Sequence, residues 1–475
     1  MRIQSLGLIA LALGLSACAG LRTSPPDAVQ QALAKTGLPA QSLAVVAFPL
    51  GARERGLRLQ PERPMQPGST MKLVTAIVSL DRLGPNSRGR TELLADAAPQ
   101  GDVLAGPLYL RGGADSDLDW GALWALLRGL REQGVREIQG GVVVDRSLFR
   151  PGRLDIGMPP FDESPEFQYN VIPDALYLNG QLLDLQLQSD AQRVHARFIP
   201  AWPGMRVDAS GLTLNDKPCE DWEDGWQTPA VSQDAGSSLV QLRGSFPHSC
   251  KTEPALNLVD RQWLATQAVR QLWHELGGVI GGEDRGGSTP ASAQLLAGHQ
   301  GRPLAEVLRG VMKDSDNPQT RLLYLRLGAA DAGPDEDTRA AAERTVRGWF
   351  AWHGIPDQGL VLDNGSGLSR SERITASQMA ALLLASHEGL YAPELLATLP
   401  VAGVDGTLSR RFKGSALEGR ARLKTGTLRN AIALAGFVPD AHGRSWIVVA
   451  MLNDEQAAAK GRPVLDAVVE WVGRQ

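Results

Sequence analysis

The sequence is poor in cysteine and histidine, the residues from which most zinc sites are built. Among its 475 residues are three cysteines and seven histidines, and no HExxH motif occurs. Zinc sites need several Cys, His or carboxylate ligands close together, and no two of these histidines are close enough in the sequence to resemble such a site. We therefore predict that the protein holds no metal.

Basic charge is not in excess either. The chain has 48 Lys and Arg residues against 52 Asp and Glu residues, which gives a formal net charge of -4. Nucleic-acid-binding proteins carry clustered positive charge, so we expect no nucleic-acid partner. The 43% hydrophobic and 21% charged content is typical of a soluble globular protein. The length predicts two or three domains.

The apolar run near the start of the chain, residues 6–15, is too short to span a bilayer as a helix. It ends at Leu-Ser-Ala-Cys, residues 15–18, which resembles the bacterial lipobox. Residues 1–17 would then be a signal peptide, Cys18 the lipidated mature N-terminus, and 18–27 a linker. A plain signal peptide is the alternative, because Ala-Cys-Ala also satisfies an A-x-A cleavage site. The residue after the cysteine is Ala19 rather than an aspartate, which resembles the sorting signal of outer-membrane lipoproteins. We therefore expect a periplasmic protein anchored to the outer membrane.

The two remaining cysteines, Cys219 and Cys250, form an even pair. In an exported protein such a pair predicts a disulfide. The alternative is two separate buried thiols.

Helical and strand-like segments alternate in a way that predicts three parts. Residues 28–84 contain a helix capped by Asp27, a strand at 43–48 and a helix at 70–80. Residues 85–285 are richer in short strands, at 108–110, 141–145 and 183–187, with one amphipathic helix at 119–133. Residues 286–475 return to helices (304–313, 321–327, 337–353, 376–387) and then a hairpin of strands at 431–437 and 446–452 before a last helix. We predict one α+β domain built from both ends of the chain, with the strand-rich middle inserted into it.

An SxxK motif lies at the start of the predicted helix, at Ser69 and Lys72. Residues three apart share a helix face, so the lysine can reach the serine hydroxyl and act as its base. The motif is weak by itself, because about two chance matches are expected in a chain of this length. The alternative is a capping serine followed by a surface lysine.

Two further motifs follow in the sequence. Ser315 and Asn317 form an SxN motif that could pass a proton and hold a substrate amide, or could be a polar turn before a proline. Residues 424–427, Lys-Thr-Gly-Thr, precede a predicted strand. There the glycine, Gly426, lets a substrate backbone approach closely, Lys424 adds positive charge, and Thr425 and Thr427 can bind a carboxylate. The alternative is an edge strand with a solvated lysine.

The order SxxK, SxN, KTG in an exported chain resembles the penicillin-binding proteins and serine β-lactamases. The long separation between Ser69 and Ser315 is similar to the S13 family of D-Ala-D-Ala carboxypeptidases/endopeptidases, which carry a large insertion after the SxxK helix. Segments that flank the motifs also resemble this family. They are residues 67–75, 363–370, 402–408 and 423–428, and residues 108–113 and 169–179 in the insertion. The sequence departs from the family pattern at three places, none of which removes a catalytic group. They are Ala114, the extra residue Asn364, and Arg429-Asn430 after the KTG segment.

The resemblance implies a transpeptidase-like fold, with an antiparallel sheet flanked by helices, and a mechanism without a cofactor. Ser69 would attack the carbonyl of the penultimate D-Ala of a peptidoglycan stem peptide, with Lys72 as base. Backbone N–H groups of Ser69 and Thr427 would form the oxyanion hole. Ser315 and Lys424 would relay the proton to the leaving amine. β-Lactam antibiotics would acylate Ser69 and remain there.

For an endopeptidase reaction the resemblance implies an acidic residue in the insertion that reads the free amine of diaminopimelic acid. Asp162 is our candidate, with Glu163 and Asp155 as substitutes, and an ordinary loop aspartate as the alternative. Two other functions stay open: a β-lactamase of the same fold, and a peptidoglycan-binding lipoprotein without activity. The sequence does not indicate an oligomeric state.

Overall fold

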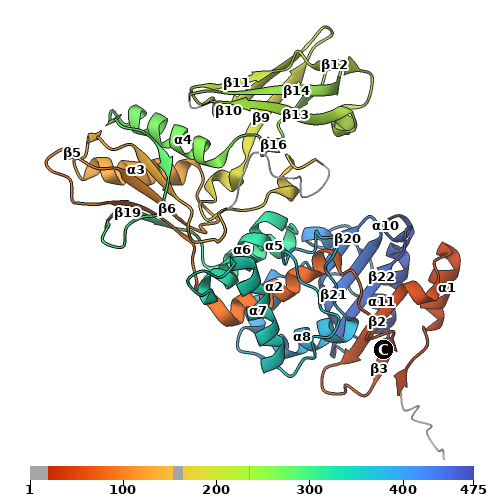
Figure 1. Ribbon diagram of the computed structural model, residues 1–475. Helices are drawn as coiled ribbons and strands as arrows, with labels where there is room; N and C mark the ends of the chain where they lie inside the picture. Colours follow the sequence, from red (N-terminus) through yellow and green to blue (C-terminus); the bar gives the residue numbers. More distant parts are fainter. Residues whose placement is uncertain (1–19, 153–163, 235) are drawn as a thin grey trace, which may run out of the picture.

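The computed structural model describes residues 20–475, apart from 153–163 and 235. It divides the chain into two regions (Figure 1). The split region is made from both ends of the chain, residues 20–89 and 301–475, and the inserted region from residues 90–300. The two connections between them lie side by side, because Gly301 N–H donates to Gly89 O at 3.1 Å and Leu304 N–H to Ser87 O at 2.9 Å.

A six-stranded sheet forms the centre of the split region, and its strands come from both ends of the chain. All neighbours are antiparallel except the first pair, β1 and β3. Both faces of the sheet are covered by helices, so its inner strands are continuous apolar runs in the sequence rather than alternating ones. Across the sheet the strands are β1 (Leu21–Arg22), β3 (Gly56–Leu59), β2 (Leu43–Pro49), β22 (Ser445–Asn453), β21 (Ala431–Pro439) and β20 (Arg422–Leu428).

Two hydrophobic cores lie on opposite faces of this sheet. One lies under α1 (Asp27–Thr36) and α11 (Arg462–Gly473). These two helices come from opposite ends of the sequence and pack together in Figure 1. The other, larger core lies under a layer of helices: α2 (Lys72–Leu83), α5 (Leu304–Lys313), α6 (Asn317–Asp331), α7 (Thr338–Trp352) and α8 (Ala376–Glu388). The short helices α9 (Ala392–Thr398) and α10 (Ala457–Lys460) complete the region.

The inserted region has one main core, shared by two helices and several small sheets. The helices are α3 (Trp120–Glu132), capped by Asp119, and α4 (Arg261–Glu275), capped by Asp260. A five-stranded sheet has the order β18 (Arg285–Gly286), β8 (Val142–Asp145), β6 (Leu108–Gly113), β4 (Arg90–Ala95) and β19 (Gln294–Gln300). A three-stranded sheet holds β17 (Val279–Ile280), β7 (Glu137–Ile138) and β5 (Val103–Leu104).

The outer part of the inserted region consists of two further sheets. In one, β9 (Leu183–Ser189) pairs with β10 (Val194–Ile199), β15 (Lys251–Thr252) and β16 (Ala255–Leu256). In the other, β14 (Ser238–Pro247) pairs with β11 (Met205–Asp208), β12 (Leu212–Asn215) and β13 (Trp226–Gln233). A disulfide joins Cys219 to Cys250, with their Cα atoms 5.2 Å apart.

The α+β class and the transpeptidase-like sheet flanked by helices are confirmed, and three details differ from the prediction. The insertion continues past residue 285, because β19 pairs with β4 as far as the pair Gln300–Arg90. Helix α4 was not predicted, although its buried residues Leu264, Ala268 and Leu272 recur at helical spacing. Asp27 is the first residue of α1 rather than its cap, since Pro26 precedes it in an extended conformation.

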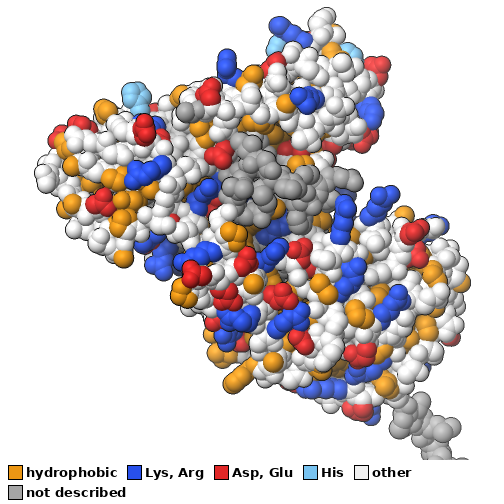
Figure 2. All heavy atoms as spheres, viewed as in Figure 1, with side chains coloured by type: hydrophobic (Ala, Val, Ile, Leu, Met, Phe, Trp, Pro, Cys, Tyr) orange, Lys and Arg blue, Asp and Glu red, His pale blue; other side chains and the backbone are white. Residues whose placement is uncertain are grey.

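The surface of the split region mixes both signs of charge. Figure 2 shows Lys and Arg side chains interspersed with Asp and Glu side chains over the face in view. Within the described parts of the chain, no helix has both the length and the apolar composition needed to cross a membrane.

Candidate active site

Ser69 lies where a 3-10 turn, Gly68–Met71, leads into α2, and its side chain is half-buried. Strand β20 packs so tightly against this turn that glycine is required on both sides. A Cβ on Gly68, which has φ 51°, would lie 3.0 Å from Thr427 N. A Cβ on Gly426 would collide with Pro67 O and lie 3.0 Å from Ser69 N. The amide nitrogens of Ser69 and Thr427 therefore lie at the same junction of turn and strand.

Lys72, one helical turn after Ser69, is completely buried and makes three polar contacts. Its Nζ lies 3.1 Å from Ser69 Oγ, 2.5 Å from Asn317 Oδ1 and 2.6 Å from the carbonyl oxygen of Ser366. Burial, with the positive charges of Lys424 and Arg321 as the next causes, holds the pKa of Lys72 well below its usual value. The structure thus favours a neutral amine beside the serine hydroxyl.

The geometry around Lys72 also orients its lone pair. A neutral amine has two N–H groups, and two of the three partners, the Asn317 and Ser366 oxygens, can only accept. The third partner, Ser69 Oγ, carries a proton of its own. When the two N–H groups point at the two acceptors, the lone pair of Nζ faces the Ser69 hydroxyl, which is the arrangement a general base needs.

The SxN motif lies between α5 and α6, opposite the Ser69 turn. Ser315 is held at φ 61°, a left-handed conformation that is rare outside glycine, and its Oγ accepts a hydrogen bond of 2.8 Å from Lys424 Nζ. Asp316 caps α6 by accepting from Gln319 N–H at 2.9 Å. Asn317 then begins the helix, with its Oδ1 on Lys72.

The KTG segment lies in β20, at the edge of the sheet. Lys424 is fully buried, and burial lowers its pKa to about 7. Thr425 Oγ1 lies 2.8 Å from Thr407 Oγ1, whereas Thr427 is exposed. The strand therefore presents two threonine hydroxyls, an open edge and a lysine that can hold or release a proton near neutrality.

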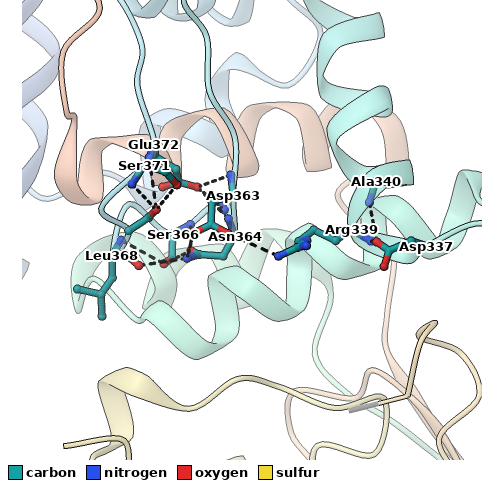
Figure 3. A network of polar contacts seen from close by, with 11 residues as sticks. Asp337, Arg339, Ala340, Asp363, Asn364, Ser366, Leu368, Ser371 and Glu372 are labelled. Carbon is teal, nitrogen blue, oxygen red and sulfur yellow. Dashed lines mark hydrogen bonds and ion pairs between the residues drawn. The ribbon is translucent and has the colours of Figure 1, made fainter. Parts of the chain in front are cut away.

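A loop between α7 and α8 closes the site behind Lys72. In Figure 3, the side chains of Asn364 and Glu372 lie against the backbone of this loop. The loop supplies the Ser366 carbonyl that contacts Lys72. Its glycine Gly367, at φ 83°, packs so closely against Gly68 that any side chain would collide with the Gly68 carbonyl.

The inserted region reaches the site through backbone groups near Tyr169. Asn317 Nδ2 donates to Tyr169 O at 3.4 Å. Arg321, from the next turn of α6, donates to Tyr169 O at 3.2 Å and to Val171 O at 2.8 Å. The same arginine is among the charges that lower the pKa of Lys72. The inserted region thus borders the residues of the three motifs through the carbonyl oxygens of Tyr169 and Val171.

A groove of about 1170 Å³ lies beside the site and could take a peptide. Its lining combines apolar and charged side chains from the 363–373 loop, the end of β20 with the turn after it, and the turn before α10. The lining residues are Gln66, Asp363, Leu368, Ser369, Arg370, Ser371, Arg373, Leu428, Arg429, Asn430, Glu455 and Gln456.

The structure therefore brings together the residues of all three motifs. Asp162 and its substitutes Glu163 and Asp155, as well as Cys18, lie outside the described residues. Sequence reasoning did not single out Thr407, Arg321, Ser366 or Glu372, although Thr407 and Ser366 lie in the flanking segments 402–408 and 363–370. Among the residues that the structure describes, His, Cys, Asp and Glu side chains do not gather in groups of three or more that could hold a metal ion.

Known proteins resemble this chain over most of its length. It is 30% identical over 427 residues to a D-alanyl-D-alanine carboxypeptidase of Actinomadura sp., a match that covers 86% of this chain and 78% of the relative. It is 27% identical over 402 residues to the D-alanyl-D-alanine carboxypeptidase DacB of Haemophilus influenzae, covering 82% and 80%.

Solved structures agree on the fold. The crystal structure of penicillin-binding protein 4 (dacB) from Haemophilus influenzae superposes with a TM-score of 0.78 at 23% identity, over 94% of this chain and 99% of that one. The family match itself spans residues 26–475, so it includes the split region and the inserted region alike. The chain therefore belongs to the D-Ala-D-Ala carboxypeptidase 3 (S13) family.

Proposed function

We propose that this protein is a serine D-Ala-D-Ala carboxypeptidase and endopeptidase that cleaves peptidoglycan stem peptides through an acyl-enzyme on Ser69. The observation that carries the proposal is the position of Lys72 Nζ, buried and 3.1 Å from Ser69 Oγ. A serine hydroxyl is a weak nucleophile until an adjacent base takes its proton. The lowered pKa of Lys72 allows a neutral amine to do so near neutral pH.

In the acylation step, Ser69 Oγ attacks the carbonyl carbon of the penultimate D-Ala while its proton passes to Lys72 Nζ. The oxyanion accepts hydrogen bonds from the N–H groups of Ser69 and Thr427. When the C–N bond breaks, the leaving amine takes a proton from Lys72 through Ser315 Oγ, which Lys424 Nζ holds at 2.8 Å. Lys72 is then neutral again and can activate a water that hydrolyses the acyl-enzyme.

Substrate binding uses the edge of β20 and the groove beside it. The peptide pairs with the strand edge as an added strand, a common mode of peptide recognition. Thr425 and Thr427 hold the terminal carboxylate, and Asn317 aligns the amide. The groove of about 1170 Å³ takes the rest of the stem peptide, which makes cross-linked peptides possible substrates. A β-lactam would enter the same site and acylate Ser69.

We infer that the protein works in the periplasm, attached to the outer membrane by lipid on Cys18. The disulfide between Cys219 and Cys250 supports an oxidising compartment. If Cys18→Ala still fractionates with membranes after export, the anchor is wrong.

Labelling with a fluorescent penicillin tests the proposal directly. The intact protein should form a covalent adduct, and Ser69→Ala should lose both this adduct and the release of D-Ala from a stem pentapeptide. A folded Ser69→Ala protein that is still labelled would place the nucleophile elsewhere. Rapid release of hydrolysed penicillin by the intact protein would indicate a β-lactamase instead.

A further inference from the structure

Glu372 is a fully buried carboxylate in the loop that closes the active site. It is not part of the SxxK, SxN or KTG motifs. Its oxygens accept four hydrogen bonds, all from backbone N–H groups of the same loop. The donors are Asp363 at 3.3 Å, Asn364 at 3.0 Å, Gly365 at 2.7 Å and Gly367 at 2.9 Å (Figure 3).

These hydrogen bonds gather the backbone around Ser366, the residue whose carbonyl oxygen lies 2.6 Å from Lys72 Nζ. The Asn364 side chain also stabilises this turn, through hydrogen bonds to Ser366 and Leu368. Its Oδ1 accepts from Ser366 N–H at 3.0 Å and from Ser366 Oγ at 2.6 Å, and its Nδ2 donates to Leu368 O at 3.1 Å. The position of the Ser366 carbonyl is therefore set by two side chains that do not touch Lys72.

The carboxylate also acts on Lys72 through its charge. The negative charge of Glu372 raises the pKa of Lys72, against the larger lowering by burial and by the two nearby cations. Burial raises the pKa of Glu372 itself, whereas its backbone N–H donors favour the ionised form. Since all of these donors are N–H groups and a carboxylate only accepts, the ionised form is the one that matches the loop.

We propose that Glu372 is a positioning residue for acylation: its carboxylate orders residues 363–367 so that the Ser366 carbonyl holds Lys72 Nζ with its lone pair toward Ser69 Oγ. The inference rests on the proposed role of Lys72 as the base. Glu372 touches neither Ser69 nor Lys72 among its hydrogen-bond partners and acts through the loop and its charge. The loop also presses Gly367 against Gly68, so its order extends to the turn that carries Ser69.

The decisive variant is Glu372→Gln, which keeps the size of the side chain and removes the charge. Its amide nitrogen would face N–H donors, so the loop should loosen and the Ser366 carbonyl should move. Small displacements of reacting groups cost up to about a hundredfold, so we expect penicillin acylation of Ser69 to fall roughly tenfold to a hundredfold. The limb of the pH profile on which acylation rises with pH should also move to lower pH, because Lys72 loses a nearby negative charge.

Asp440→Asn provides the matched control. Asp440 is also fully buried and accepts from backbone N–H groups, those of His442 and Arg444, but it lies in the hairpin between β21 and β22. This variant should lower the melting temperature. The folded protein should keep the acylation rate of the parent, and its acylation should rise with pH over the same pH range. Glu372→Asp, which keeps the charge and shortens the side chain, should acylate more slowly with the limb unmoved.

The outcomes separate this inference from the proposed function. If the parent protein is not acylated at Ser69, the proposed function fails. If the parent is acylated and Glu372→Gln matches it in rate and pH limb, only the positioning role fails. Equal losses in Glu372→Gln and Asp440→Asn, with no movement of the limb, would reduce Glu372 to a structural residue. Should Glu372→Gln not fold, a full acylation rate in Glu372→Asp overturns the proposal.

Discussion

The split region and the inserted region bury their residues in different ways. In the split region both faces of the sheet are covered by helices, and Lys72 and Lys424 are completely buried. Most strands of the inserted region are shorter, although β14 has ten residues, and an outer strand such as β10 alternates between buried and exposed residues. The inserted region meets the catalytic groups through carbonyl oxygens of Tyr169 and Val171. The comparison leads us to expect the chemistry and the binding of the scissile end of the peptide in the first region, and recognition of diaminopimelic acid in the second.

The strongest test of this separation is Lys72→Ala. Removing the general base should slow acylation by penicillin and by peptide to a similar extent, roughly a thousandfold. Lys460→Ala, which removes an exposed lysine of the same region, should leave both rates unchanged. Acylation rates would be measured with a fluorescent penicillin and a D-Ala-D-Ala peptide. Near-normal acylation in Lys72→Ala would mean that another group is the base.

The pH dependence should report the two buried lysines of the split region. Acylation rises with pH while Lys72 loses its proton, and falls as Lys424, with a pKa of about 7, loses the charge that attracts the substrate carboxylate. Two pH units above that pKa about 1% of Lys424 keeps its proton, so acylation by penicillin should fall by up to about a hundredfold by pH 9.

A change of side chain identifies the group behind that falling limb. In Lys424→Arg the guanidinium stays charged throughout, and the limb should disappear even if the rate is lower. The measurement is the second-order acylation rate from pH 5 to pH 9. A rate that does not change between pH 6 and pH 9 in the parent protein would contradict the assignment to Lys424.

The smallest effect is expected in the inserted region, where a substitution should slow turnover of cross-linked peptides but not acylation by penicillin. If Asp162 reads the amine of diaminopimelic acid by a charge-assisted hydrogen bond, Asp162→Ala should slow turnover of native cross-linked peptides roughly tenfold to a hundredfold. Penicillin lacks that amine, so its acylation of Ser69 should hardly change. Asp162→Asn keeps the shape without the charge and should show the same split. A parallel loss of both activities would make Asp162 structural, and no loss would direct attention to Glu163 or Asp155.

The two regions also differ in how much of them the sequence predicts. The helices and strands of the split region follow from long apolar patterns, and α5 has the predicted bounds 304–313. In the inserted region, β19 was missed because its seven residues from Gln294 to Gln300 are mostly exposed or half-buried and show no clear apolar face. Short strands of this kind depend on their partners, so local sequence contains little information about them.

At the site, the motifs identify the side chains to which we assign direct roles in the reaction, because their spacing has a chemical reason. The side chains that act through others were not predicted. Glu372 is an unremarkable glutamate in the sequence, and its burial among backbone N–H groups exists only once the 363–372 loop has folded. Arg321 is similar, since its contacts with Tyr169 O and Val171 O join segments 150 residues apart.

The pairing of β2 with β22 has a consequence for biogenesis. Val45 lies opposite Ala450, so the central sheet joins residues that are translated at very different times. Non-local pairing of this kind is slow because a long loop must close before any contact stabilises it. The inserted region is continuous in the chain and can fold before the last strands of the split region have paired. Since Ser69 is held against β20, one of the last strands in the sequence, we expect the folding chain to stay inactive until β20 has joined the sheet.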